Sequence, residues 1–189
     1  MVLFTSDNGP WLDKGKDGGV AHPLRGGKFS CLEGGVREPT IAWWPGRITA
    51  GSTCDAMMSE MDVLPTLVNL AGGTIPADKK IDGLDVWPLL SGKSRKSPHE
   101  ALFYFAGNKL QGVRADEWKL LNGQLYNLAT DIGEKTNVAE KNPEVVQRLQ
   151  SFMDMMDKDL GINGTGPGVR PCGKVDKPGP LVMDDKEYN

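Results

Sequence analysis

The first residues of the chain constrain its fold strongly. Met1 to Thr5 is an unbroken, largely apolar run of β-forming residues, and the turn-forming segment Ser6-Asp7-Asn8-Gly9-Pro10 follows it directly. Such a run bounded by turn residues is typical of a strand buried on both faces inside a parallel sheet. Such a strand needs neighbours on both sides, whereas chain starts are usually exposed. We therefore expect an α/β fold, with part of its sheet supplied from upstream of Met1.

The composition excludes several classes of protein. The chain has 24 glycine and 13 proline residues in 189, against an average usage of roughly 12% for the two together, so an all-helical bundle is not expected. The 22 Lys and Arg residues face 25 Asp and Glu, which excludes the basic surface of a nucleic-acid binder. No apolar run is long enough to span a membrane, and the first residues lack the pattern of a signal peptide.

The three cysteines give little guidance. Cys31, Cys54 and Cys172 are widely spaced and form no C-x-x-C pair, so they predict neither a zinc site nor a disulfide framework. One disulfide with a free thiol, or three reduced thiols, both fit this pattern. We favour the reduced, structural interpretation.

Residues 1–97 have the pattern of an α/β unit. A long glycine-rich loop, 11–35, precedes a second apolar strand predicted over Val36–Trp44, which Pro45-Gly46 closes. Ser59–Ala71 is predicted as a helix, with Ser59 or Asp62 as its cap. One face of this helix is apolar, and its members are Leu64, Leu67, Val68 and Ala71.

Residues 98–162 have a different pattern, beyond a polar and basic boundary at 91–98. Four short strands with tight spacing predict an antiparallel meander: Ala101–Phe105, Lys109–Arg114, Trp118–Leu121 and Leu125–Leu128. A helix follows, with Asn142 as its cap, Pro143 in its first turn and Gly161 after its end. Its apolar stripe is expected to pack on the meander. Residues 163–189 are rich in glycine, proline and charge, and an extended tail is expected there.

The first candidate site follows the first strand. Asp7 and Asn8 lie where a strand of an open α/β sheet ends, which is where such folds bind ligands. A carboxylate beside an amide carbonyl supplies hard oxygen donors suited to Ca²⁺ or Mg²⁺. The alternative is an Asx turn that ends the strand, and these residues alone favour that alternative.

The second candidate site lies in the glycine-rich loop. It comprises Leu24-Arg25-Gly26-Gly27-Lys28 and, a few residues later, Glu33-Gly34-Gly35-Val36-Arg37-Glu38-Pro39. Paired glycines let the backbone approach an anion, and Lys28 adds a mobile positive charge suited to a tetrahedral oxyanion. The loop is not a Walker A motif, because Phe29 follows Lys28. The alternative is a surface loop with solvated charges.

Together these motifs resemble the C-terminal half of the sulfatases. The resemblance covers roughly residues 1 to 160 and includes S-D-N-G-P, L-R-G-G-K, E-G-G-V-R-E-P and W-W-P-G in this order, then Met61–Leu67, Asp82–Asp85, Leu125–Leu128 and Asp131–Asn137. It implies an α/β fold, namely the C-terminal part of an alkaline-phosphatase-like mixed sheet, followed by a small antiparallel sheet packed against a C-terminal helix. It also implies a periplasmic, secreted or lysosomal location.

The resemblance assigns roles to a few matched positions only. Asp7 and Asn8 match the pair that binds a divalent metal, usually Ca²⁺, with Mg²⁺ as the alternative. Lys28 matches the lysine that contacts the sulfate group and stabilises charge on the leaving oxygen. His22 lies in the same loop and could face substrate, although it matches no family position, and His99 is expected to be structural.

The chain departs from the family pattern in its nucleophile. Sulfatases use a formylglycine made from the Cys or Ser of C/S-x-P-x-R, and that motif is absent here, as are the paired N-terminal aspartates of the metal site. We therefore expect a fragment that is inactive alone, lacks the N-terminal half of its domain, and could self-associate through the surface left exposed. Its substrate would be an aryl or carbohydrate sulfate ester. A phosphatase or phosphodiesterase of the same superfamily and a non-catalytic binding module are the alternatives.

Overall fold

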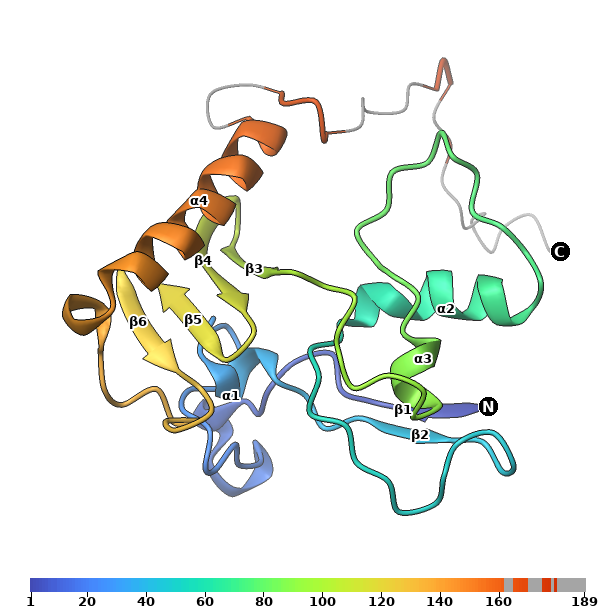
Figure 1. The fold of residues 1–189 in the computed structure, drawn as a ribbon, viewed down its shortest axis with the longest axis horizontal. Helices are drawn as coiled ribbons and strands as arrows, with labels where there is room; N and C mark the ends of the chain where they lie inside the picture. The colour runs from blue at the N-terminus through green and yellow to red at the C-terminus, as the bar shows by residue number, and fades with distance from the viewer. Residues whose placement is uncertain (162–164, 170–174, 178, 180–189) are drawn as a thin grey trace, which may run out of the picture.

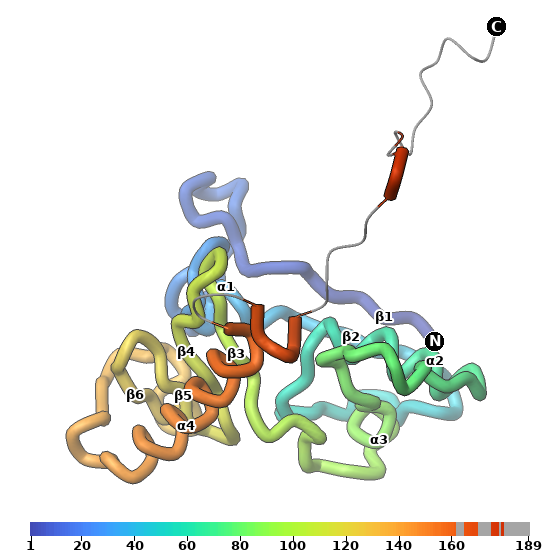
Figure 2. The backbone as a smooth tube through the Cα atoms, turned by 90° about the horizontal axis from the view of Figure 1, so that it is seen from above, coloured from blue at the N-terminus to red at the C-terminus, as the bar shows by residue number. Residues whose placement is uncertain are grey.

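The computed structural model describes residues 1–161, 165–169, 175–177 and 179, and arranges them in two groups of elements (Figure 1). The N-terminal elements are β1 (Val2–Phe4), η1 (Leu12–Asp17), α1 (Glu33–Val36), β2 (Ile41–Trp43), η2 (Glu60–Asp62), α2 (Val63–Leu70) and α3 (Trp87–Leu90). The C-terminal elements are β3 (Leu102–Ala106), β4 (Lys109–Ala115), β5 (Trp118–Leu121), β6 (Gln124–Asn127), η3 (Ala139–Lys141) and α4 (Pro143–Leu160). In both views α1 lies beside the C-terminal group (Figures 1 and 2).

The C-terminal elements confirm the predicted meander and helix. The strands pair antiparallel in the order β3-β4-β5-β6. Asn122 and Gly123 join β5 to β6 with positive φ at both positions, 49° and 76°, which suits a tight hairpin turn. Helix α4 starts at Pro143 and ends before Gly161, as its sequence predicts. Asn142 occupies the cap position, but its side-chain amide donates to the Val138 carbonyl and does not cap the helix.

The meander is covered on both faces. On one face, α4 seats Leu149 in a core formed with Val113, Ala115, Leu120 and Leu125. On the other face, Leu121, Tyr126 and Leu128 pack against Cys31 and Leu32, which belong to the glycine-rich loop. The C-terminal sheet therefore serves as the platform on which the second candidate site rests.

The first strand forms as predicted, but its predicted burial inside a parallel sheet is wrong. β1 forms, but it pairs antiparallel with β2 in a two-stranded sheet and is not a central parallel strand. Its side chains are largely exposed, with Phe4 66% and Trp43 of β2 60% accessible. β2 is also shorter than predicted, because Val36 belongs to α1 and residues 37–40 form no strand. The exposed side chains lie on one face of this sheet, which no described element covers, whereas Leu3 and Ala42 on the other face are half-buried.

The predicted helix at 59–71 is observed as η2 followed by α2. Its start is confirmed as a capping box, in which Ser59 accepts from the Met61 N–H and Asp62 accepts from the Ser59 N–H. The apolar face that the sequence indicates is largely exposed: Leu64 is 57% and Leu67 is 45% exposed. Pro65 and Thr66 are the buried residues, because the helix packs through its opposite side.

The predicted tail lies mostly outside the described residues. Its part at 165–169 turns back onto the end of α4, where the Gly166 and Gly168 N–H groups donate to the carbonyls of Leu160 and Asp159. Cys31 and Cys54 are free thiols, whereas Cys172 lies outside the described residues. Within the described part, no helix is both long and apolar enough to cross a bilayer.

Candidate functional site

The two candidate sites lie next to each other. The Gly9 N–H donates to the Gly35 carbonyl at 3.2 Å, and the Lys28 N–H donates to the Pro10 carbonyl at 2.9 Å. These backbone bonds join the end of the S-D-N-G-P segment to both glycine pairs of the loop. Asp7, Asn8 and Lys28, which are separated by about twenty residues in the sequence, are therefore brought into one region.

The glycines at this junction permit a very close approach of backbone to backbone. A Cβ atom on Gly9 would lie 1.8 Å from the Gly34 carbonyl oxygen, and one on Gly35 would lie 2.2 Å from the Ser30 carbonyl oxygen. No side chain fits at such separations. The structure thus gives these glycines a packing role, in addition to the approach to an anion that the sequence suggests.

Asp7 and Asn8 carry hard oxygen donors that the fold leaves available. Asp7 is exposed and Asn8 is half-buried. Among the described residues neither side chain makes a hydrogen bond, and the turn is closed by Ser6, whose hydroxyl donates to the Asn8 carbonyl at 2.9 Å. The Asx turn that the sequence favoured is therefore not formed through Asp7.

A second carboxylate, Glu38, lies close enough to Asp7 for the two charges to interact. Burial raises the pKa of Glu38, and the negative charges of Glu60 and Asp7 raise it further. Its Oε1 atom is buried and has no hydrogen-bond partner among the described residues. A cation near Asp7 would relieve this concentration of negative charge. Within the same described residues, no group of three or more His, Cys, Asp or Glu is arranged to hold a metal ion by itself.

Lys28 is half-buried and lies against two aromatic rings. Its Nζ atom is 5.5 Å from the centroid of Trp11 and 5.5 Å from that of Phe29. The two rings meet edge to face, with centroids 6.0 Å apart. No carboxylate in the described part of the chain forms an ion pair with Lys28. Its positive charge is consequently not neutralised by an ion pair with any described residue.

His22 is exposed and makes no hydrogen bond or ion pair within the described residues. Its neighbours Ala21 and Leu24 line a cavity of about 320 Å³ together with Pro10, Gly34, Arg37 and Glu38. This cavity lies between the 20–24 segment and the residues that follow α1. His22 is therefore placed at the edge of the candidate site, with no described partner.

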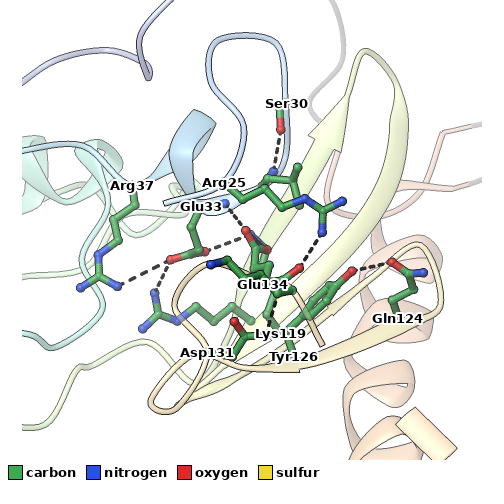
Figure 3. Close-up of polar contacts among 12 residues, drawn as sticks. Arg25, Ser30, Glu33, Arg37, Lys119, Gln124, Tyr126, Asp131 and Glu134 are labelled. Atoms are coloured by element: carbon green, nitrogen blue, oxygen red, sulfur yellow. Dashed lines mark hydrogen bonds and ion pairs between the residues drawn. The ribbon is translucent and has the colours of Figure 1, made fainter. Parts of the chain in front are cut away.

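A buried charge network holds the glycine-rich loop on the C-terminal sheet, and sequence reasoning missed most of it (Figure 3). Lys119 of β5 lies 2.9 Å from Glu33 of α1 and 2.9 Å from Glu134, and all three side chains are fully buried. Arg114 of β4 approaches Glu33 at 3.4 Å. The Lys119 ammonium also lies over the Tyr104 ring, 4.5 Å from its centroid.

Glu134 forms hydrogen bonds with Arg25 and Glu33, which lie on either side of Lys28 in the loop. Its carboxylate accepts from the Glu33 N–H at 2.6 Å, and its backbone carbonyl accepts from the Arg25 guanidinium at 2.5 Å. Glu134 itself adopts a left-handed backbone conformation, with φ of 51°. Because one residue contacts both Arg25 and Glu33, the conformation of the loop between them depends on the C-terminal segment.

A second buried cluster is built around Asp62. Its carboxylate accepts from the N–H groups of Ser59 and Leu84, at 2.7 and 2.8 Å, and lies 2.7 Å from the His99 imidazole. His99 therefore joins the C-terminal part of the chain to the start of α2. This cluster lies within structural elements, and none of its members touches Asp7, Asn8 or Lys28 through a described polar contact.

The architecture defines a mixed α/β protein with antiparallel sheets and a C-terminal helix. Residues 27–159 match the family described as N-sulphoglucosamine sulphohydrolase, C-terminal. The chain therefore belongs to the sulfatase family, as its C-terminal portion. This confirms the family and fold class that the sequence motifs indicate.

Individual sulfatases support this assignment. Human steryl-sulfatase is 42% identical over 119 residues, which are 60% of this chain and 20% of that protein. Human arylsulfatase A is 37% identical over 188 residues, which cover 80% of this chain and 36% of that protein. The structure of a sulfatase from Pseudoalteromonas sp. superimposes with a TM-score of 0.76 at 26% identity, over 87% of this chain and 38% of that one. The chain thus spans between a fifth and two fifths of the length of these proteins.

Proposed function

We propose that this chain supplies the sulfate-contacting lysine and half of the divalent-metal site of an enzyme that hydrolyses aryl or carbohydrate sulfate esters. The observation that carries the proposal is the junction of the two site segments. The Lys28 N–H donates a hydrogen bond to the carbonyl of Pro10, which lies two residues beyond Asn8. One region therefore offers an ammonium that has no carboxylate partner among residues 1–161, 165–169, 175–177 and 179, and hard oxygen donors on the segment to which its backbone is bonded.

In this proposal Lys28 binds the anionic end of the substrate. An ammonium with three movable donors suits the tetrahedral sulfate group. Its placement against Trp11 and Phe29 limits the directions from which water reaches it. As the ester bond breaks, negative charge grows on the leaving oxygen, and a fixed positive charge nearby stabilises that change.

Asp7 and Asn8 would hold Ca²⁺, or Mg²⁺ as the alternative. Neither side chain makes a hydrogen bond among the described residues, and the pKa of Glu38 is raised by burial first and then by the negative charges of Glu60 and Asp7. Two protein ligands are few for Ca²⁺, which takes six to eight oxygen ligands, so we expect weak binding by this chain alone. When bound, the cation would neutralise sulfate oxygens and polarise the bond to sulfur.

The remainder of a sulfatase domain is the proposed partner of the exposed apolar surfaces. Phe4 and Trp43 on the two-stranded sheet and Leu64 on α2 are each more than half exposed. The chain also contains no C/S-x-P-x-R motif from which a formylglycine could form. We therefore propose that the nucleophile and the other metal ligands come from outside these residues, and that the isolated chain hydrolyses nothing and self-associates through these surfaces.

Inorganic sulfate titrated into the ¹⁵N-labelled chain tests the role of Lys28. We expect amide shifts in residues 26–35 and, in Lys28→Met, an affinity reduced by about fivefold or more, because a charge-assisted contact is lost. Lys93→Met, which removes an exposed lysine elsewhere, is the matched control. Equal sulfate affinity in Lys28→Met and the parent chain would contradict the proposal, as would robust turnover of 4-nitrophenyl sulfate by the chain alone with Ca²⁺.

A further inference from the structure

A second lysine shares the aromatic ring against which Lys28 lies. The Nζ atom of Lys14, in η1, is 4.6 Å from the Trp11 ring centroid, while that of Lys28 is 5.5 Å from the same centroid. Both ammonium groups therefore contact the same indole ring. The segment between β1 and α1 that includes η1 projects from the rest of the chain (Figure 2).

Backbone hydrogen bonds hold the main chain of both lysines close to Trp11. The Lys14 N–H donates to the Trp11 carbonyl at 3.0 Å, and the Lys28 N–H donates to the Pro10 carbonyl at 2.9 Å. The main chain of each lysine is thus held next to Pro10 or Trp11, so both side chains start close to the same indole. The edge-to-face contact with Phe29 fixes the indole from a further side.

The charges in this cluster are not balanced by ion pairs. Asp13 and Asp17 also belong to η1, but neither lies within ion-pair distance of a lysine in the described part of the chain. Two ammonium groups beside one ring place positive charge on both, and an anion bound between or beside them is attracted by each. The ring stabilises each cation through its π face but adds no negative charge.

We propose that Trp11 and Lys14 form a subsite for a second anionic group on the substrate, next to the sulfate bound by Lys28. The inference rests on the proposed function, since it takes Lys28 as the contact of the reacting sulfate. It deepens that function by naming a substrate class: sulfate esters of saccharides that carry a further sulfate or carboxylate. Lys14 then determines specificity without touching the reacting atoms, and the indole positions the ammonium.

The test compares galactose 6-sulfate with galactose 2,6-disulfate, titrated into the full chain at low ionic strength and followed by amide shifts. We expect the disulfated sugar to bind about fivefold more tightly, a preference that added salt weakens because the contact is exposed. Lys14→Met should remove this preference and leave binding of the monosulfated sugar within about twofold of the parent chain. Lys16→Met removes the same charge from the same helix without an aromatic contact, and should keep the preference.

The outcomes separate the two proposals. If the monosulfated sugar binds through Lys28 but the disulfated sugar binds no more tightly, the subsite is wrong and the proposed function stands. The subsite is equally wrong if Lys16→Met abolishes the preference as fully as Lys14→Met, since the effect would then be one of net charge. If neither sugar binds in a manner that depends on Lys28, the proposed function fails and the subsite fails with it.

Discussion

Replacement of Lys119 by methionine is expected to destabilise the chain by about 3–5 kcal/mol, because it leaves two buried carboxylates without their shared cation. Lys119 is fully buried and lies 2.9 Å from both Glu33 and Glu134. Methionine fills much of the same volume, so the loss is electrostatic and does not arise from a cavity. Urea unfolding of the parent chain and of the variant measures the difference.

Two control variants separate charge from general destabilisation. Arg148→Met breaks an exposed ion pair with Asp116, at 3.5 Å, and should cost less than about 1 kcal/mol. Leu149→Ala opens the core on the opposite face of the sheet and should cost about 2–5 kcal/mol. Of these variants, only Lys119→Met should also weaken sulfate binding by the folded molecules. Equal stability of Lys119→Met and Arg148→Met would contradict the assigned role of the network.

Replacement of Gly9 by alanine is expected to cost about 3 kcal/mol or more and to abolish sulfate binding at Lys28. The new Cβ would lie 1.8 Å from the Gly34 carbonyl oxygen and 2.9 Å from the Gly35 Cα. Both of these are backbone atoms, which cannot rotate away, so overpacking must separate the two segments. Asp7 and Asn8 would then move away from the loop that carries Lys28.

Gly73→Ala is the matched control for this variant. Its nearest contact would be a side-chain atom, Val68 Cγ1, at 3.2 Å, which can yield by a few tenths of an ångström. Thermal unfolding and a sulfate titration measure both variants. If Gly9→Ala retained the stability and the sulfate affinity of Gly73→Ala, then close packing at Gly9 would not hold the site together.

The sequence predicts the C-terminal half of the fold well because its signals are local. The meander depends on short strands and on the turn at Asn122-Gly123, and α4 on Pro143, Gly161 and the stripe between them. Burial is predicted less well in the N-terminal half. An apolar residue in a strand or helix is buried only if another element covers it. No described element covers Phe4 of β1 or Leu64 of α2, and both side chains are exposed.

The candidate site shows the same division between local and distant signals. Asp7, Asn8 and Lys28 stand in motifs that can be recognised from adjacent residues. The contact of Lys119 with Glu33 joins residues 86 positions apart, and that of Glu134 with Glu33 joins residues 101 positions apart. A lysine within the strand Trp118–Leu121 would ordinarily be assigned to solvent. It is buried because the glycine-rich loop covers the sheet face opposite α4, an arrangement that no short pattern predicts.

The most direct test of the central claim is the coupling between Ca²⁺ and sulfate on this chain. If Asp7, Asn8 and Lys28 form one site, the cation and the anion attract each other there, and each must tighten the binding of the other by the same factor. We predict that saturating Ca²⁺ increases sulfate affinity by about fivefold or more, and that Asp7→Asn and Lys28→Met each remove the increase. An unchanged sulfate affinity in the presence of Ca²⁺, or an increase that persists in Asp7→Asn, would contradict the claim that these residues form a sulfatase half-site.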